Sequence, residues 1–153
     1  MAIRIGTLAD STLIARPLGE LKRVICCSPG YLKRAGTPQH PDELLQHACL
    51  RYGREGQNGW VLQVNGKAKW LAVQGPMVSN NGEVLRDAAL AGLGLVLLPA
   101  FILETALQRG ELVTVLDGCQ PPPLSLNAVY PQHRQRSEVN RQLLAFLQAR
   151  LAP

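Results

Sequence analysis

The sequence has few aromatic residues and no long uninterrupted apolar stretch. Aromatic residues make up 5% of the 153 residues, whereas 46% are hydrophobic, so the core must be built mainly from Leu, Val, Ala and Ile. No apolar run approaches the roughly 20 residues that a membrane-spanning helix needs. Residues 1–6 read as a strand and lack the basic and apolar regions of a secretory signal. We therefore expect a cytoplasmic globular protein with no membrane partner.

The four cysteines lack the spacing of a metal or redox site. They are Cys26, Cys27, Cys49 and Cys119, and no two of them form the Cys-x-x-Cys pair typical of zinc and dithiol motifs. Buried, reduced thiols are expected. We also find no nucleophile–base set and no paired carboxylates, which predicts a protein that is not an enzyme and holds no metal and no cofactor.

Strong charge and a DNA-binding motif are missing as well. The formal net charge is +5, and a basic helical face of this size is usually only solvated. No helix-turn-helix pattern can be read in the chain, so we expect no direct contact with DNA through these residues.

The rest of the chain is organised around residues 78–110, which read as a helix, a glycine turn, an apolar strand and a second helix. Asn80 is expected to cap the first helix, with Glu83 as its reciprocal partner. Residues 95–98 contain no polar side chain, which is typical of a strand covered on both faces. Pro99 is expected to start the second helix. The pattern predicts a parallel or mixed sheet with helix N-termini at its strand ends.

A β-hairpin is the clearest local signal elsewhere. Residues 60–64 and 67–73 are joined by Asn65 and Gly66, a pair that suits a type I′ turn. Trp60, Leu62 and Val64 alternate with Val61 and Gln63 along the first strand, which predicts one apolar face.

Two further helices have readable starts. Residues 21–27 are predicted to form a strand, after which Ser28 serves as a helix cap and Pro29 as the first helical residue. Ser137 is expected to cap a long helix that runs to about Leu151.

Two extended crossings, near residues 15–19 and 117–124, divide the chain. They predict one lobe made of residues 1–16 and 117–153 and a second lobe made of residues 17–116. The second lobe has the size of a small domain. The first contains only two short strands and one helix, which is a poor core, so this lobe is expected to be incomplete.

These pieces, taken in order, resemble the effector-binding domain of LysR-type transcriptional regulators. The matching segments are AIRIG at residues 2–6, LIARPLGELKRVICCSPGYLKRAGTPQHPDEL at 13–44, SNNGEVLRDAALAGLGLVLLPAFI at 79–102, GELVTVL at 110–116, PPPLSLNAVYP at 121–131, and the final helix. Each is a weak signal alone, but their joint order and spacing are specific. The resemblance covers essentially the whole chain.

The resemblance implies an α/β fold like that of type 2 periplasmic binding proteins, with two Rossmann-like lobes of which one, here, is incomplete. It implies two regulatory subdomains, a small-molecule effector held between them, and a homodimer or tetramer. It also implies that DNA is contacted only through a helix-turn-helix domain absent from this chain. We therefore interpret the chain as an N-terminally truncated sensor domain of a transcription regulator.

The expected ligand contacts share one location, because ligands in such sheets sit at strand ends near helix N-termini, where a carboxylate effector would meet backbone N–H groups. They are Gly6, Thr7, Ser28, Pro29, Asn80, Asn81, Gly82 and Pro99.

Simpler interpretations stay open for several of these residues. Ser28 and Asn80 fit equally well as helix caps alone. Pro99 fits as a helix-starting residue, and Thr7 as an ordinary loop residue.

Alternative functions also stay open. The chain could be a solute-binding protein of a transport system, although the missing signal peptide disfavours this. It could be a small α/β enzyme with Cys26 or Cys27 as its nucleophile. It could also act only by pairing with full-length relatives.

Overall fold

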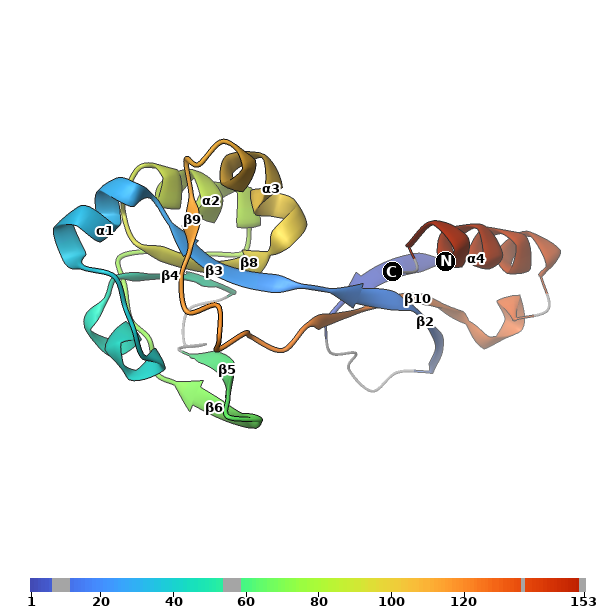
Figure 1. The fold of residues 1–153 in the computed structure, drawn as a ribbon. Coiled ribbons are helices and arrows are strands. Elements are labelled where there is room, and N and C mark those ends of the chain that lie inside the picture. Colours follow the sequence, from blue (N-terminus) through green and yellow to red (C-terminus); the bar gives the residue numbers. More distant parts are fainter. Residues whose placement is uncertain (7–11, 54–58, 136, 152–153) are drawn as a thin grey trace. The chain divides into compact units, whose positions relative to one another are not determined.

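The computed structural model describes residues 1–6, 12–53, 59–135 and 137–151, and it divides the chain into two compact units (Figure 1). Unit 1 contains Met1–Leu21 and Pro123–Pro153, and unit 2 contains Lys22–Pro122. The sequence predicted boundaries after residues 16 and 116. In the structure they fall after residues 21 and 122, five and six residues later. The difference arises because the strand pairing of unit 1 continues as far as Leu21, which lies opposite Leu124.

Unit 2 is built on a mixed five-stranded sheet in the order β7-β4-β8-β3-β9. The strands are β7 (Val78–Ser79), β4 (Cys49–Tyr52), β8 (Leu95–Pro99), β3 (Arg23–Cys27) and β9 (Val113–Thr114). β4 runs parallel to both β7 and β8. β3 runs antiparallel to both β8 and β9. The strand predicted over residues 21–27 is shorter in the structure, where it spans Arg23–Cys27. It runs antiparallel to both of its neighbours in the sheet.

The central strand β8 is covered on both faces, as its composition predicts. Leu95 and Leu97 belong to one core cluster, together with Ile25 of β3. Val96 and Leu98 belong to a second cluster on the other face. Residues 95–98 are all buried, because alternate side chains of a strand point to opposite faces and each face here has its own cover.

Two helices cover one face of the sheet, and a hairpin with two shorter helices covers the other (Figure 1). Helices α2 (Gly82–Leu90) and α3 (Ala100–Gln108) supply the first cover. The second contains α1 (Pro29–Ala35), the 3₁₀ helix η1 (Pro41–Gln46) and the hairpin strands β5 (Trp60–Val64) and β6 (Lys67–Leu71).

The hairpin has the predicted turn and the predicted apolar face. Asn65 and Gly66 adopt φ values of 51° and 77°, as the two central residues of a type I′ turn require. Trp60 and Leu62 are buried in the core of unit 2. Trp70, on the other face of the hairpin, is 62% exposed.

Unit 1 is a three-stranded antiparallel sheet in the order β1-β10-β2 with one helix packed on it. Its elements are β1 (Ala2–Ile5), β2 (Leu13–Leu21), β10 (Leu124–Pro131), the 3₁₀ turn η2 (Gln132–Arg134) and α4 (Glu138–Leu151). Pro17 lies in β2, an edge strand of this sheet, where the missing N–H removes no internal ladder bond. Ser137 caps α4 through Asn140, whose N–H lies 3.5 Å from the hydroxyl oxygen.

The core of unit 1 is small. Leu18, Leu126 and Ala128 are its buried members. Ile3 and Ile5 lie opposite Ala128 and Leu126 in the register, so they share the face of the sheet that α4 covers. Each is nevertheless 50% exposed. Within the described residues, the apolar face of this sheet therefore extends beyond the helix that packs on it.

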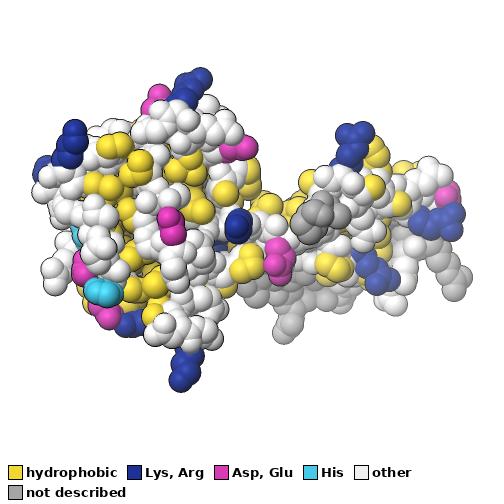
Figure 2. Space-filling view, in the orientation of Figure 1, with side chains coloured by type: hydrophobic (Ala, Val, Ile, Leu, Met, Phe, Trp, Pro, Cys, Tyr) yellow, Lys and Arg dark blue, Asp and Glu magenta, His cyan; other side chains and the backbone are white. Residues whose placement is uncertain are grey.

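Basic side chains do not form one continuous patch on the face shown in Figure 2. Lys and Arg side chains lie in separate groups on this face, with acidic side chains between them. This distribution agrees with the expectation that the modest positive charge is a solvated surface.

Two glycines in unit 2 should respond in opposite ways to an added methyl group. A Cβ at Gly94 would lie 2.2 Å from the carbonyl oxygen of Ala48, whereas a Cβ at Gly30 would meet nothing within 4 Å. We expect Gly94→Ala to destabilise the protein by at least about 2 kcal/mol, because the backbone must move apart beside β8. Gly30→Ala, in α1, should be neutral or stabilising by up to about 0.5 kcal/mol.

Chemical denaturation of both variants by urea measures the difference. Equal midpoints for Gly94→Ala and the unchanged protein would show that the close approach between residues 48 and 94 is absent.

Candidate functional site

The carboxyl ends of three strands meet at one edge of the unit 2 sheet. β4, β7 and β8 are mutually parallel, so Gly53 and Asn80, which follow β4 and β7, and Pro99, which ends β8, all lie at this edge. Helices α2 and α3 begin directly after β7 and β8. In doubly wound sheets this is the edge where small ligands bind.

Ser28 and Pro29 lie at the opposite edge, so the prediction that they share a site with Asn80 and Pro99 is wrong. β3 is antiparallel to β8, with Arg23 opposite Pro99 and Cys26 opposite Val96. The carboxyl end of β3 therefore lies beside the start of β8, and a Cβ on Gly92 would be 3.5 Å from Ser28 Oγ.

Ser28 acts as a helix cap, as its sequence context also allows. Its hydroxyl oxygen accepts a hydrogen bond from the N–H of Tyr31 at 3.2 Å, and Pro29 occupies the first position of α1. Both residues are thus accounted for by the start of a helix.

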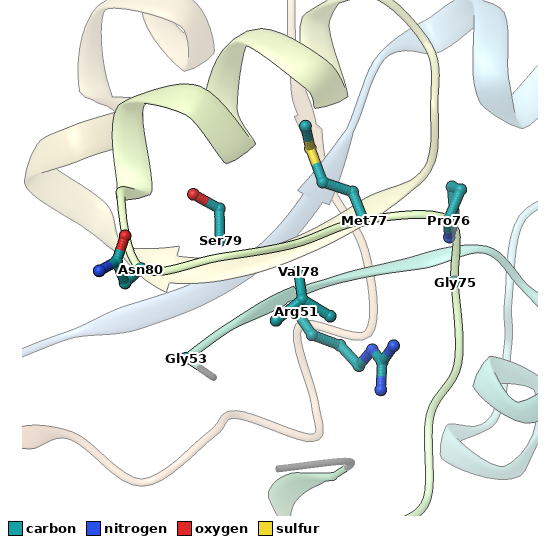
Figure 3. A pocket seen from close by; sticks show the side chains of 8 residues that line it. All are labelled: Arg51, Gly53, Gly75, Pro76, Met77, Val78, Ser79 and Asn80. Atoms are coloured by element: carbon teal, nitrogen blue, oxygen red, sulfur yellow. The ribbon is translucent and has the colours of Figure 1, made fainter. Parts of the chain in front are cut away.

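A pocket of about 630 Å³ runs along β4 and β7 and reaches the ligand edge at Gly53 and Asn80 (Figure 3). Its lining comes from the end of β4 and from the chain that leads through β7, namely Arg51, Gly53, Gly75, Pro76, Met77, Val78, Ser79 and Asn80. Arg51 lies opposite Val78 in the register. Figure 3 shows these two side chains on one side of the strands and those of Met77 and Ser79 on the other.

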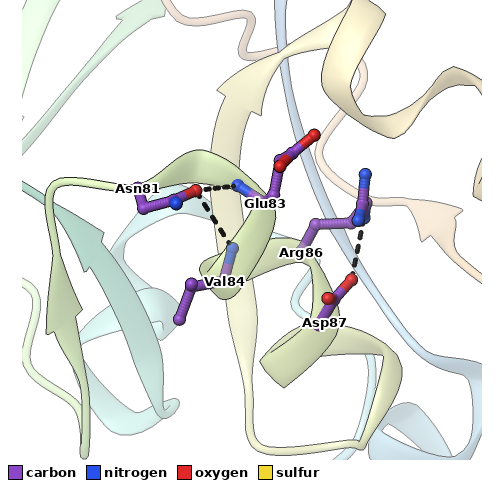
Figure 4. A network of polar contacts seen from close by, with 5 residues as sticks. All are labelled: Asn81, Glu83, Val84, Arg86 and Asp87. Atoms are coloured by element: carbon purple, nitrogen blue, oxygen red, sulfur yellow. Dashed lines mark hydrogen bonds and ion pairs between the residues drawn. The ribbon is translucent and has the colours of Figure 1, made fainter.

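Asn81, rather than Asn80, caps α2 (Figure 4). Asn81 Oδ1 accepts hydrogen bonds from the N–H groups of Glu83, at 2.9 Å, and Val84, at 3.4 Å. The predicted capping pair of Asn80 and Glu83 is therefore wrong by one residue. Gly82, the first residue of the helix, lies close to α3, since a Cβ there would be 2.8 Å from Ile102 Cδ1. This register leaves Asn80 in the pocket wall.

The cap also changes how an anion would be held at this edge. The N–H groups of Glu83 and Val84 bind Asn81 Oδ1, and the N–H of Asn81 donates to Ser79 Oγ at 3.1 Å. The expectation that the amides around Asn81 and Gly82 meet a carboxylate is weakened, because most of the first turn is satisfied internally. The positive charge of the pocket comes from the guanidinium of Arg51.

Sequence reasoning missed Arg51. The available signal was a single arginine in the strand Cys49–Tyr52, two positions after a fully buried residue. A cation in the inner strand of a sheet, close to its carboxyl end, is unusual enough to indicate a binding role.

The other predicted contacts stay separate from the pocket lining. Pro99 ends β8 and precedes α3 without a side-chain cap. Gly6 belongs to unit 1, where its N–H donates to the carbonyl of Ser125 at 2.8 Å and its own carbonyl accepts from Ser125 Oγ at 3.0 Å. Thr7 lies outside the described residues.

The thiols are unsuited to nucleophilic catalysis. Cys26, Cys27 and Cys49 are fully buried, and burial raises the pKa of each thiol to about 12. For Cys26 the neighbouring Cys27 adds to the increase in pKa. The described part of the chain also contains no cluster of three or more His, Cys, Asp or Glu side chains that could hold a metal ion.

A mixed α/β sheet with a pocket at the carboxyl edge of its parallel strands is typical of small-molecule-binding domains. Comparison with known families specifies the class. Residues 1–152 match the model described as the LysR substrate binding domain. The chain therefore belongs to this family, and its fold is the type 2 periplasmic-binding-protein-like fold of that domain.

Individual relatives agree with this assignment. The chain is 43% identical over 150 residues to the HTH-type transcriptional regulator YhjC of Escherichia coli K12, covering 95% of this chain and 49% of that protein. It is 34% identical over 150 residues to the HTH-type transcriptional regulator CrgA of Neisseria meningitidis serogroup B, covering 96% and 48%. The chain thus spans about half the length of the curated relatives it matches.

Solved structures show the same fold. The regulatory domain of CrgA from N. meningitidis aligns with a TM-score of 0.80 at 31% identity, over 97% of this chain and 74% of that one. The full-length virulence activator AphB of Vibrio cholerae aligns with a TM-score of 0.80 at 30% identity, over 97% and 51%. No helix in the described residues is long and apolar enough to cross a membrane.

Thiol labelling tests the remaining enzymatic alternative. At pH 8 a thiol with a pKa near 12 is ionised to about one part in ten thousand, so Cys26, Cys27 and Cys49 should not react with iodoacetamide in the folded protein. The half-buried Cys119 should be the first residue modified. Mass spectrometry of the digested protein identifies the labelled site, and all four should react in urea. Rapid labelling of Cys26 or Cys27 would restore the enzyme hypothesis.

Proposed function

We propose that this chain is the ligand-sensing regulatory domain of a LysR-type transcriptional regulator. Its family and the regulators it resembles support this role. In the proposed whole protein, a helix-turn-helix domain outside these residues contacts DNA. A small effector would then control transcription by favouring one of two arrangements of the regulator, provided that it binds them with different affinities.

The two units correspond, in this proposal, to the two regulatory subdomains. Unit 2, Lys22–Pro122, is subdomain two, and unit 1 is part of subdomain one. The full-length relatives support assembly into a homodimer or tetramer.

The observation that carries the proposal is the pocket that runs along β4 and β7 and reaches their carboxyl ends. It brings the guanidinium of Arg51 and the amide of Asn80 into one lining. A guanidinium binds a carboxylate through two parallel N–H bonds, and a side-chain amide supplies a further donor. We therefore propose a small carboxylate as the effector, held by Arg51 and Asn80.

The neighbouring asparagines provide a matched pair of variants. Asn80 lines the pocket, and Asn81 caps α2. We expect Asn80→Ala to leave the unfolding free energy unchanged but to weaken carboxylate binding about tenfold, through loss of one hydrogen bond to a charged group. Asn81→Ala should cost about 1 kcal/mol of stability with affinity unchanged.

A thermal-shift screen of aromatic and aliphatic carboxylates finds the ligand, since binding to the folded state raises Tm. Titration calorimetry with the best compound then measures the affinity of each variant. The proposed contacts would be refuted if Asn80→Ala bound as tightly as the unchanged protein. The carboxylate class would be refuted if no compound in the screen raised Tm.

A further inference from the structure

The two chain segments that leave unit 2 pair through their backbones as far as Leu21 and Leu124, and one side chain of unit 2 joins them just beyond that pair. Unit 2 begins at Lys22 and ends at Pro122. Arg23, the second residue of the unit, donates two hydrogen bonds to the carbonyl oxygen of Pro122, from Nε at 2.9 Å and from Nη2 at 2.7 Å. These residues are 99 positions apart in the sequence, so the contact closes unit 2 at its boundary.

The composition of the outgoing segment explains why it needs such a partner. Residues 121–123 are three consecutive prolines, which have no N–H and cannot join a strand ladder. The segment is held through its carbonyl groups instead. The Gln120 carbonyl accepts from the N–H of Gln63 at 2.9 Å, and the Pro122 carbonyl accepts from Arg23.

The incoming segment is anchored at the same place. The carbonyl of Lys22 accepts a hydrogen bond from the N–H of Ala100 at 2.9 Å. Arg23 lies opposite Pro99 in the β3–β8 register. The first turn of α3, both crossing segments and the side chain of Arg23 therefore meet at the ligand edge of the sheet.

Arginine is suited to this position by its planar fork of donors. Two N–H groups of one guanidinium reach one carbonyl oxygen, a geometry that the single ammonium of lysine does not reproduce. Burial lowers the pKa of Arg23, and among the described residues it makes no ion pair. Burying a charge without an acidic partner costs free energy, and here the two hydrogen bonds to Pro122 offset that cost.

We propose that Arg23 is a positioning residue that clamps the two crossing segments together beyond the last strand pair, Leu21 with Leu124, and so limits how far they separate where they enter unit 2. The clamp acts whether or not an effector is bound, so this inference does not depend on the proposed ligand. Loss of the clamp frees the proline segment while the core of unit 2 stays intact, because β8 keeps all of its own strand pairs.

The test compares Arg23→Lys with Arg34→Lys. Arg34 also donates to a backbone carbonyl, with Nη2 2.7 Å from the oxygen of Gly92, but it lies in α1 away from the boundary. Hydrogen exchange measured by mass spectrometry should show amides 118–120 exchanging at least fivefold faster in Arg23→Lys and unchanged in Arg34→Lys. Exchange of the β8 amides should be the same in both variants.

A distance measurement gives an independent readout. Spin labels are attached at Lys33→Cys in unit 2 and Ala145→Cys in unit 1, in a Cys119→Ser background, and pulsed electron resonance records their separation. Arg23→Lys should broaden the distance distribution at least twofold, and Arg34→Lys should leave it unchanged. The clamp is refuted if Arg23→Lys leaves both the distribution and the exchange of residues 118–120 unchanged, or if it speeds exchange of β8 equally.

Discussion

The structure of unit 2 depends on the burial of β8 on both faces. Residues 95–98 are wholly apolar, and each face contributes to a separate core cluster. A strand of this kind must lie inside the sheet, with partners on both sides. Its partners run in opposite directions, since β4 is parallel to it and β3 is antiparallel. That difference in direction decides which turns share the ligand edge and which lie at the other end of the sheet.

The directions of the strands determine where each candidate functional residue lies. Arg51 and Asn80 line one pocket because β4 and β7 are parallel and end together. Ser28 is excluded from it because β3 ends at the other edge, where its hydroxyl caps α1. The same reversal brings the start of β3 to the ligand edge, so Arg23 can reach the carbonyl of Pro122. The orientation of β3 thus keeps Ser28 away from the ligand edge and brings Arg23 to it, where the clamp between the crossing segments forms.

Features set by neighbouring residues could be predicted from the sequence. Features set by the pairing of distant strands could not. The Asn65–Gly66 turn and the doubly buried strand follow from residue type and periodicity, and the structure confirms both. The direction of β3 could not be predicted, because an apolar run reads the same in either orientation and its partner lies about 70 residues away. Asn80 and Asn81 are chemically equal caps, so residue type alone could not predict that Asn81 caps α2. Arg51 carried no local motif, since its importance arises only from the neighbouring strand.

The most direct test is a map of backbone amide shifts in a ¹H–¹⁵N NMR spectrum during titration with the carboxylate that most raises the Tm. The largest changes should fall at Arg51, Gly53, Ser79 and Asn80, which line one pocket at the ends of parallel strands. The amides of Ser28 and of residues 30–35 should not move, because they lie at the opposite edge. Shifts concentrated in residues 28–35 would contradict the strand arrangement on which this account of the site depends.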